Sequence, residues 1–85
     1  MNDTIVTSAQ FATIRAYAAS QPCFSQELRE LDRMVDTKRR LERLFGEQPD
    51  TYDFYYAEAS RDISQSTLNW VRRIVPLVNP DGTIA

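Results

Sequence analysis

The residues that break helices occupy only a few positions of this chain. They are Gly46, Gly82, Pro22, Pro49, Pro76 and Pro80. Proline removes a backbone donor and glycine favours non-helical backbone, so both tend to end helices. Between these positions, apolar residues recur at spacings of three and four, which is typical of a helix buried on one face. The sequence therefore predicts an all-α fold, a small antiparallel bundle of three to four helices.

Two of the expected helices have clear limits. The first runs over about residues 8–19, with Thr7 or Ser8 able to cap its free amides. The second runs over about residues 25–45 and is followed by a glycine, and its acidic residues precede its basic ones, as the helix dipole favours. A chain of 85 residues has room for one small core, so we expect residues 1–85 to form a single helical domain.

The third stretch, about residues 51–75, allows two interpretations. Several poor helix formers, serines and an aspartate, indicate a break near residues 60–64 and hence two short helices. Aromatic and apolar residues from Tyr52 to Ile74 nevertheless recur at spacings that place them on one face of a single helix, with no glycine or proline between them. This pattern favours one continuous helix. The sequence leaves both interpretations open.

The last ten residues, PLVNPDGTIA, differ from the rest of the chain in their turn-forming composition. They hold two prolines and an Asp-Gly pair, neither of which suits a helix. We therefore expect residues 76–85 to form an extended C-terminal tail that docks on the helices through Leu77 and Val78.

Composition excludes several kinds of chemistry. With no histidine and one cysteine, Cys23, the chain lacks the common zinc-ligand sets, histidine-based catalysis and any intramolecular disulfide. Glu27, Glu30 and Asp53 have no metal-binding or acid–base spacing, so we expect no catalytic residue, no cofactor, no metal and no enzyme activity. The lone cysteine, and a start without a basic region or long apolar run, predict a cytoplasmic protein without a membrane partner.

The segment YDFYY, residues 52–56, places four aromatic side chains in five positions. Four such neighbours on a helix do not all point inward, so we expect one or two tyrosines at the surface. Surface tyrosine near tryptophan and arginine is favoured at protein interfaces. The expected protein-binding surface consists of Tyr52, Tyr55, Tyr56, Arg61 and Trp70, with Trp70 either completing it or sealing the core. The alternative is that the tyrosine rings line the core and keep their hydroxyls in water.

These observations favour a small non-enzymatic protein-binding module, a regulator or inhibitor that acts by occluding a partner protein. Tyr55 and Tyr56, followed by Asp62, Ser64 and Leu68, resemble the paired tyrosines of colicin-type DNase immunity proteins, although the proline that commonly follows the pair is missing. Those proteins inhibit a basic nuclease, and the resemblance implies that a helical scaffold of this kind can serve as an inhibitor. A homodimer is a further expectation, because the long second helix carries more apolar positions than one small partner helix can cover.

The segment that starts at Ala59, ASRDISQSTLNWVRR, resembles the second half of a helix-turn-helix DNA-binding unit. It has no glycine in the turn, and Ala57 and Ala59 lie eleven and nine positions before Leu68, where that family usually has ten. The resemblance implies, as the alternative function, a transcriptional regulator that binds DNA through residues 65–73. The residues facing base edges and phosphates would be Gln65, Ser66, Asn69, Arg72 and Arg73. In the competing interpretation these residues are only the solvent face of a packing helix.

Overall fold

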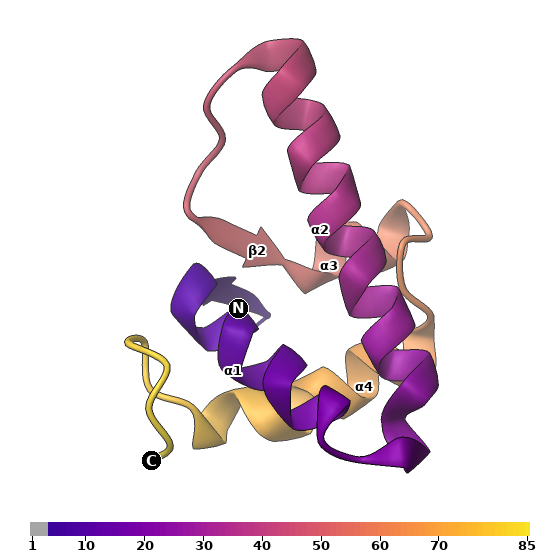
Figure 1. The fold of residues 1–85 in the computed structure, drawn as a ribbon, viewed down its shortest axis with the longest axis vertical. Helices are drawn as coiled ribbons and strands as arrows, with labels where there is room; N and C mark the ends of the chain where they lie inside the picture. The colour runs from indigo at the N-terminus through magenta and orange to yellow at the C-terminus, as the bar shows by residue number, and fades with distance from the viewer. Residues whose placement is uncertain (1–3) are drawn as a thin grey trace.

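A computed structural model, which describes residues 4–85, confirms the predicted helical class (Figure 1). The described chain forms four α-helices, a sheet of two short antiparallel strands and two 3-10 turns. In chain order the elements are β1 (Ile5–Thr7), α1 (Ser8–Ala19), η1 (Pro22–Phe24), α2 (Ser25–Phe45), β2 (Thr51–Asp53), α3 (Phe54–Ala59), α4 (Gln65–Ile74) and η2 (Val75–Leu77). Within this part of the chain, no helix has the length and apolar character needed to cross a membrane.

Helices α1 and α2 cover the predicted residues and run in opposite directions across the short turn η1 (Figure 1). Thr7 begins α1 with a capping box. Its hydroxyl accepts a hydrogen bond from the Gln10 N–H at 3.0 Å, and the Gln10 side-chain oxygen accepts one from the Thr7 N–H at 2.8 Å. Gly46 ends α2 with a φ of 88°, a backbone conformation that glycine adopts without a steric penalty.

The two-stranded sheet was not predicted from the sequence. Strand β1 pairs with β2 so that Val6 lies opposite Tyr52, which fixes residues 5–7 against the segment after α2. Three-residue strands are too short to show an alternating pattern, so periodicity did not reveal them. As a consequence, Tyr52 lies in a strand, and the next helix begins only at Phe54.

The stretch after β2 forms two helices, as in the first of the two interpretations. Asp53 caps α3 and Ser64 caps α4, each by accepting a hydrogen bond from a backbone N–H one turn ahead. Between them, Arg61 adopts a φ of 68°, and the N–H of Asp62 bonds back to the Ala57 carbonyl at 2.8 Å. This is a Schellman ending, in which arginine occupies the left-handed position that glycine usually takes. The chain therefore turns sharply where a continuous helix would run straight.

The C-terminal tail leaves η2 and folds back against α1. Val78 is buried as predicted, whereas Leu77 is exposed and does not dock the tail. Gly82 has a φ of 90°, and a Cβ there would come within 2.9 Å of the Ala9 carbonyl oxygen, so this close approach requires glycine. Side chains of α1 and its cap hold the tail by donating to its carbonyl oxygens, Thr7 to Pro80, Gln10 to Val78 and Thr13 to Gly82.

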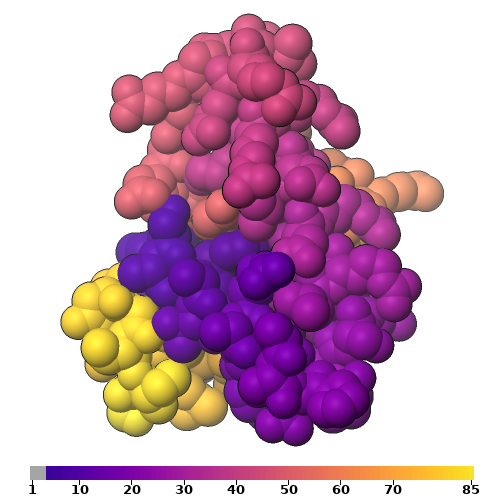
Figure 2. Space-filling model, in the orientation of Figure 1, coloured from indigo at the N-terminus to yellow at the C-terminus, as the bar shows by residue number. Residues whose placement is uncertain are grey.

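The core lies between α1, the N-terminal half of α2, and α4, which crosses the lower part of the molecule in Figure 1. Its fully buried side chains include Ile14, Leu31 and Val71, with Val6 contributed by β1 and Phe54 by α3. The C-terminal end of α2 and the loop that follows it extend beyond this core and form the narrower upper part of the molecule (Figure 2).

Candidate functional site

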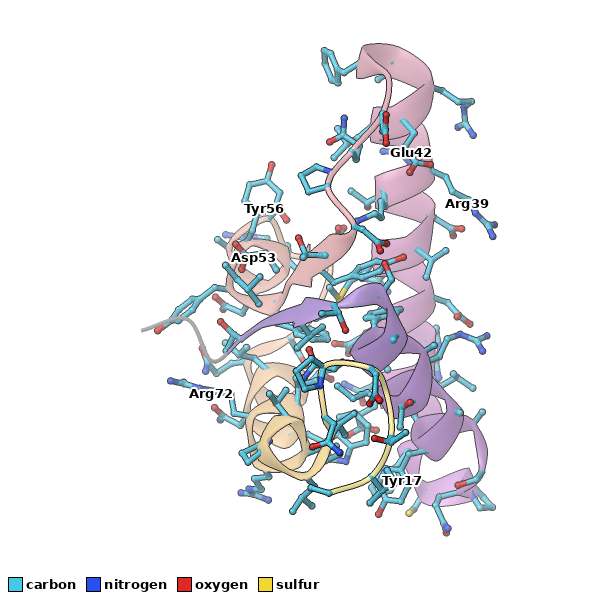
Figure 3. All side chains as sticks on the ribbon, turned by 90° about the vertical axis from the view of Figure 1, so that its left-hand side faces the viewer. Tyr17, Arg39, Glu42, Asp53, Tyr56 and Arg72 are labelled. Atoms are coloured by element: carbon cyan, nitrogen blue, oxygen red, sulfur yellow. The ribbon has the colours of Figure 1, made fainter. Side chains whose placement is uncertain are left out.

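The short helix α3 carries two tyrosines that extend into solvent. Tyr55 is 51% exposed and Tyr56 is 62% exposed, and Figure 3 shows Tyr56 pointing away from the body of the molecule. They are exposed because the opposite face of α3 is anchored in the core by Phe54 and Ala57. Arg61, in the turn after α3, is also exposed. We refer to Tyr55, Tyr56 and Arg61 as the tyrosine surface.

Helix α4 supports this surface from one side. The guanidinium carbon of Arg72 lies 5.7 Å from the centre of the Tyr55 ring, within the range of a cation–π interaction. At an exposed position such a contact contributes about 0.5–1 kcal/mol. The tyrosine surface and the exposed face of α4 are therefore continuous.

A largely apolar cleft of about 300 Å³ opens beside Tyr56. One wall is the C-terminal half of α2, and the other is formed by the loop after α2, β2, α3 and the turn that follows α3. Its lining includes Ile5, Met34, Leu41, Tyr56 and Ala57. The volume is at the lower end of the range for small-molecule pockets, and it suits one or two side chains of a partner.

Lys38 fixes the two walls of the cleft relative to each other. Its ammonium group donates hydrogen bonds to the carbonyl oxygens of Pro49, at 2.6 Å, and Thr51, and it lies 4.3 Å from the centre of the Tyr52 ring. Tyr52 also stacks on Phe11, with ring centres 3.9 Å apart. Burial of Tyr52 raises the pKa of its hydroxyl above its usual value. Tyr52 therefore forms part of the cleft wall and is less accessible than Tyr55 and Tyr56.

The structure places Trp70 in a different cluster from the tyrosine surface. Its ring is half-buried and packs against Tyr17 and Phe24, with ring centres 6.2 and 5.2 Å away. These contacts lie on the side of α4 that faces α1 and η1, whereas Arg72 reaches Tyr55. Of the two roles that the sequence allowed, Trp70 has the position of a residue that seals the core.

The five residues of the DNA-binding alternative share one face of α4. Because successive helical residues are 100° apart, these side chains fall within about a third of the helix circumference. All of them are exposed, and they are Gln65, Ser66, Asn69, Arg72 and Arg73. Helix α4 has no acidic residue, and in the part of the chain that the structure describes neither arginine forms an ion pair. The positive φ of Arg61 gives the preceding turn the reversal for which a glycine was expected.

Glu30 is buried, but its contacts are structural. Its carboxylate accepts hydrogen bonds from the Ser64 N–H at 2.6 Å and from the Gln26 amide at 2.9 Å, which ties α2 to the start of α4. Burial by itself would raise the pKa of Glu30, but the hydrogen bonds outweigh it and hold the pKa below its usual value. Cys23 is exposed. Residues 4–85 contain no group of three or more His, Cys, Asp or Glu side chains placed to hold a metal ion.

Sequence reasoning did not find the cleft, because long-range contacts create it. The pairing of β1 with β2 and the hydrogen bonds of Lys38 bring its walls together, and neither leaves a local pattern in the sequence. The chain matches no protein-family model, no curated protein and no solved structure in the comparisons made.

Proposed function

We propose that this chain is a small non-enzymatic protein-binding module, which regulates or inhibits a partner protein by covering part of its surface. The observation that carries the proposal is the presence of two adjacent exposed tyrosines on α3, one of which, Tyr56, lines an apolar cleft. Exposed aromatic rings bury a large area on binding and lose little conformational freedom, which makes them frequent anchors of interfaces.

The frame behind the tyrosines supports this role. Asp53 caps α3, Phe54 anchors it in the core, and Arg72 packs against Tyr55, so the helix and the Tyr55 ring are positioned before a partner arrives. Such preorganisation lowers the entropic cost of binding. Asp53 and Asp62 line the cleft, which favours a partner segment with basic residues next to an apolar side chain. Occlusion needs no further chemistry, and an exposed free Cys23 suits a reducing, cytoplasmic setting.

The test is capture of partner proteins from a cell extract by the immobilised chain. Tyr55→Ala should weaken capture about 10-fold or more, the effect of losing an interface anchor. Tyr17→Ala is the matched control, because Tyr17 is an exposed tyrosine on a different face, in the Trp70 cluster. A specific partner retained equally by the wild type and Tyr55→Ala would contradict the proposed surface.

The exposed face of α4 favours DNA binding as a second candidate function. A helix with amide and hydroxyl side chains in its first half and two arginines in its last turn matches the needs of base and phosphate contacts. The test is fluorescence anisotropy of a labelled DNA duplex at about 50 and about 200 mM salt, a range over which phosphate-driven binding falls steeply. Binding that disappears in Arg72→Ala with Arg73→Ala, and persists in Arg39→Ala with Arg40→Ala, would support this candidate. No binding at the lower salt concentration would exclude it.

A further inference from the structure

The last turn of α2 exposes two large apolar side chains that the fold leaves uncovered. Leu44 is 66% exposed and Phe45 is 74% exposed, the highest value among the large apolar residues that the structure describes. The end of α2, which carries both residues, lies at the narrow end of the molecule (Figures 1 and 2). Leu41, one helical turn before Phe45, lines the cleft. An apolar projection and an apolar cavity therefore occur side by side on one surface.

The segments that form the two walls of the cleft differ in net charge, and of their charged residues Lys38, Asp53 and Asp62 line the cleft itself. Residues 37–46, at the end of α2, hold four basic side chains and one acidic one, a net charge of +3. Residues 47–62, which form the facing wall, hold five acidic side chains and one basic one, a net charge of −4. Within residues 4–85, the ion pair closer than 4 Å joins Arg15 to Asp32, and neither residue belongs to these segments. Lys38 is held by the carbonyl oxygens of Pro49 and Thr51, whereas the arginines of the first segment and the carboxylates of the second form no ion pair in the described part of the chain and are available to another molecule.

We propose that a second copy of this chain occupies the cleft, in a two-fold symmetric dimer. Phe45 of each copy enters the cleft of the other, and the basic end of each α2 lies along the acidic wall of the other copy. A two-fold dimer requires a surface that is complementary to itself. This surface combines the exposed Leu44 and Phe45, the apolar cleft, and one basic and one acidic segment. A different partner would need to reproduce all of these features, whereas a second copy already has them.

Self-association has a consequence for the tyrosine surface. Because Tyr56 lines the cleft, a dimer covers it and competes with capture of a different partner there. The dimer itself does not depend on the proposed function, since its contacts involve the end of α2 and the charged walls. Tyr55→Ala should therefore leave self-association unchanged, and a monomeric protein could still capture a partner through Tyr55.

The first experiment measures molar mass by sedimentation equilibrium at low salt, from about 10 μM to about 1 mM, a range suited to a weak dimer. The wild type should shift from the mass of one chain, 9.8 kDa, to twice that value. Leu44→Ala with Phe45→Ala should keep the mass of one chain throughout. Leu77→Ala with Ile84→Ala removes exposed apolar side chains elsewhere and should dimerise like the wild type. A wild type that stays monomeric at the highest concentration, or a Leu44/Phe45 variant that still dimerises, would overturn the proposal.

A charge exchange then tests the arrangement of the two copies. Arg40→Glu with Arg43→Glu, and separately Glu47→Lys with Asp62→Lys, place like charges opposite each other and should each give monomers. An equimolar mixture of the two variants should restore a dimer with one copy of each, because both halves of the mixed interface then pair opposite charges. Circular dichroism melts show whether each variant is folded before its mass is interpreted. If the folded variants form no mixed dimer, the proposed pairing of the walls is wrong.

Discussion

The two halves of α2 belong to one continuous helix but have different surroundings. In the N-terminal half, Leu31 and Met34 are buried against α1 and α4. In the C-terminal half, Leu44 and Phe45 are exposed, and the neighbouring structure is a loop and a strand held by Lys38. The same kind of side chain therefore stabilises the fold at one end and remains available for binding at the other.

Helix length accounts for this difference. The 21 residues of α2 extend about 31 Å, whereas the 12 residues of α1 and the 10 of α4 extend about 18 and 15 Å. Helices of this size cover only about half of α2. An apolar stripe longer than its intramolecular partners leaves a surface for intermolecular contact, and in this chain the cleft lies next to that surface.

The largest expected effect on stability comes from a substitution in the buried, N-terminal half of α2. Leu31→Ala should lower the free energy of unfolding by about 2–5 kcal/mol, because it opens a cavity among side chains that cannot fully collapse. Leu44→Ala makes the same chemical change in the exposed half and should cost less than about 0.5 kcal/mol. Urea unfolding of both variants measures the difference. Equal losses would mean that the two halves of α2 are equally packed.

The second prediction concerns Glu30, whose carboxylate accepts hydrogen bonds in the buried, N-terminal half of α2. Glu30→Gln should lower stability at neutral pH by about 1.5–3 kcal/mol, the contribution of hydrogen bonds to a charged group. Because folding lowers the pKa of Glu30, the ionised carboxylate stabilises the native state above the unfolded-state pKa, about 4.5, and this stabilisation is lost as pH falls through the lowered native-state pKa. Unfolding measured between about pH 7 and pH 3 should show a smaller acid-dependent loss in Glu30→Gln than in the wild type. Parallel pH profiles would exclude this role.

The third prediction concerns Arg61, in the turn between α3 and α4 that follows the exposed tyrosines. Arg61 adopts a left-handed φ that costs a non-glycine residue about 1–2 kcal/mol. Arg61→Gly should therefore raise the free energy of unfolding by about 1 kcal/mol, after allowing for the greater flexibility of glycine in the unfolded chain. If Arg61 contacts the partner, the same variant should be more stable and yet weaker in capture. Arg61→Ala, which keeps the strain, should weaken capture without the gain in stability.

Long elements with local signals were predictable from this sequence, and long-range contacts were not. Helices α1 and α2 agree with prediction because each has many turns of apolar spacing and a cap or glycine at its ends. The break near residues 60–64 had local signals as well, but helical phase alone did not decide between one helix and two. The backbone hydrogen bond from Asp62 to Ala57 decides it, and Ile63 is buried beside that turn.

The candidate site shows the same division. Crowding of aromatic residues in a short segment predicted exposed tyrosines, and Tyr55 and Tyr56 are exposed. Trp70 lies apart from them, because its position depends on how α4 packs against α1, which no local pattern specifies. The exposure of Phe45 could not be predicted either, because the apolar stripe of α2 does not indicate how far the helices that pack on it extend.

The smallest expected effect on the free energy of unfolding comes from Phe45→Ala. It distinguishes a side chain that lies in solvent from one that packs weakly against the core. At concentrations low enough to keep the chain monomeric, Phe45→Ala should change the free energy of unfolding by less than about 0.5 kcal/mol, because its ring makes few intramolecular contacts. At higher concentration the wild type should melt at a rising temperature, since dimerisation stabilises only the native state, whereas Phe45→Ala should melt at a constant temperature. A loss of more than about 1 kcal/mol at every concentration would instead place Phe45 in the fold itself. The exposed half of α2 would then be a poorly packed extension of the core, and its apolar residues would give no reason to expect a second copy.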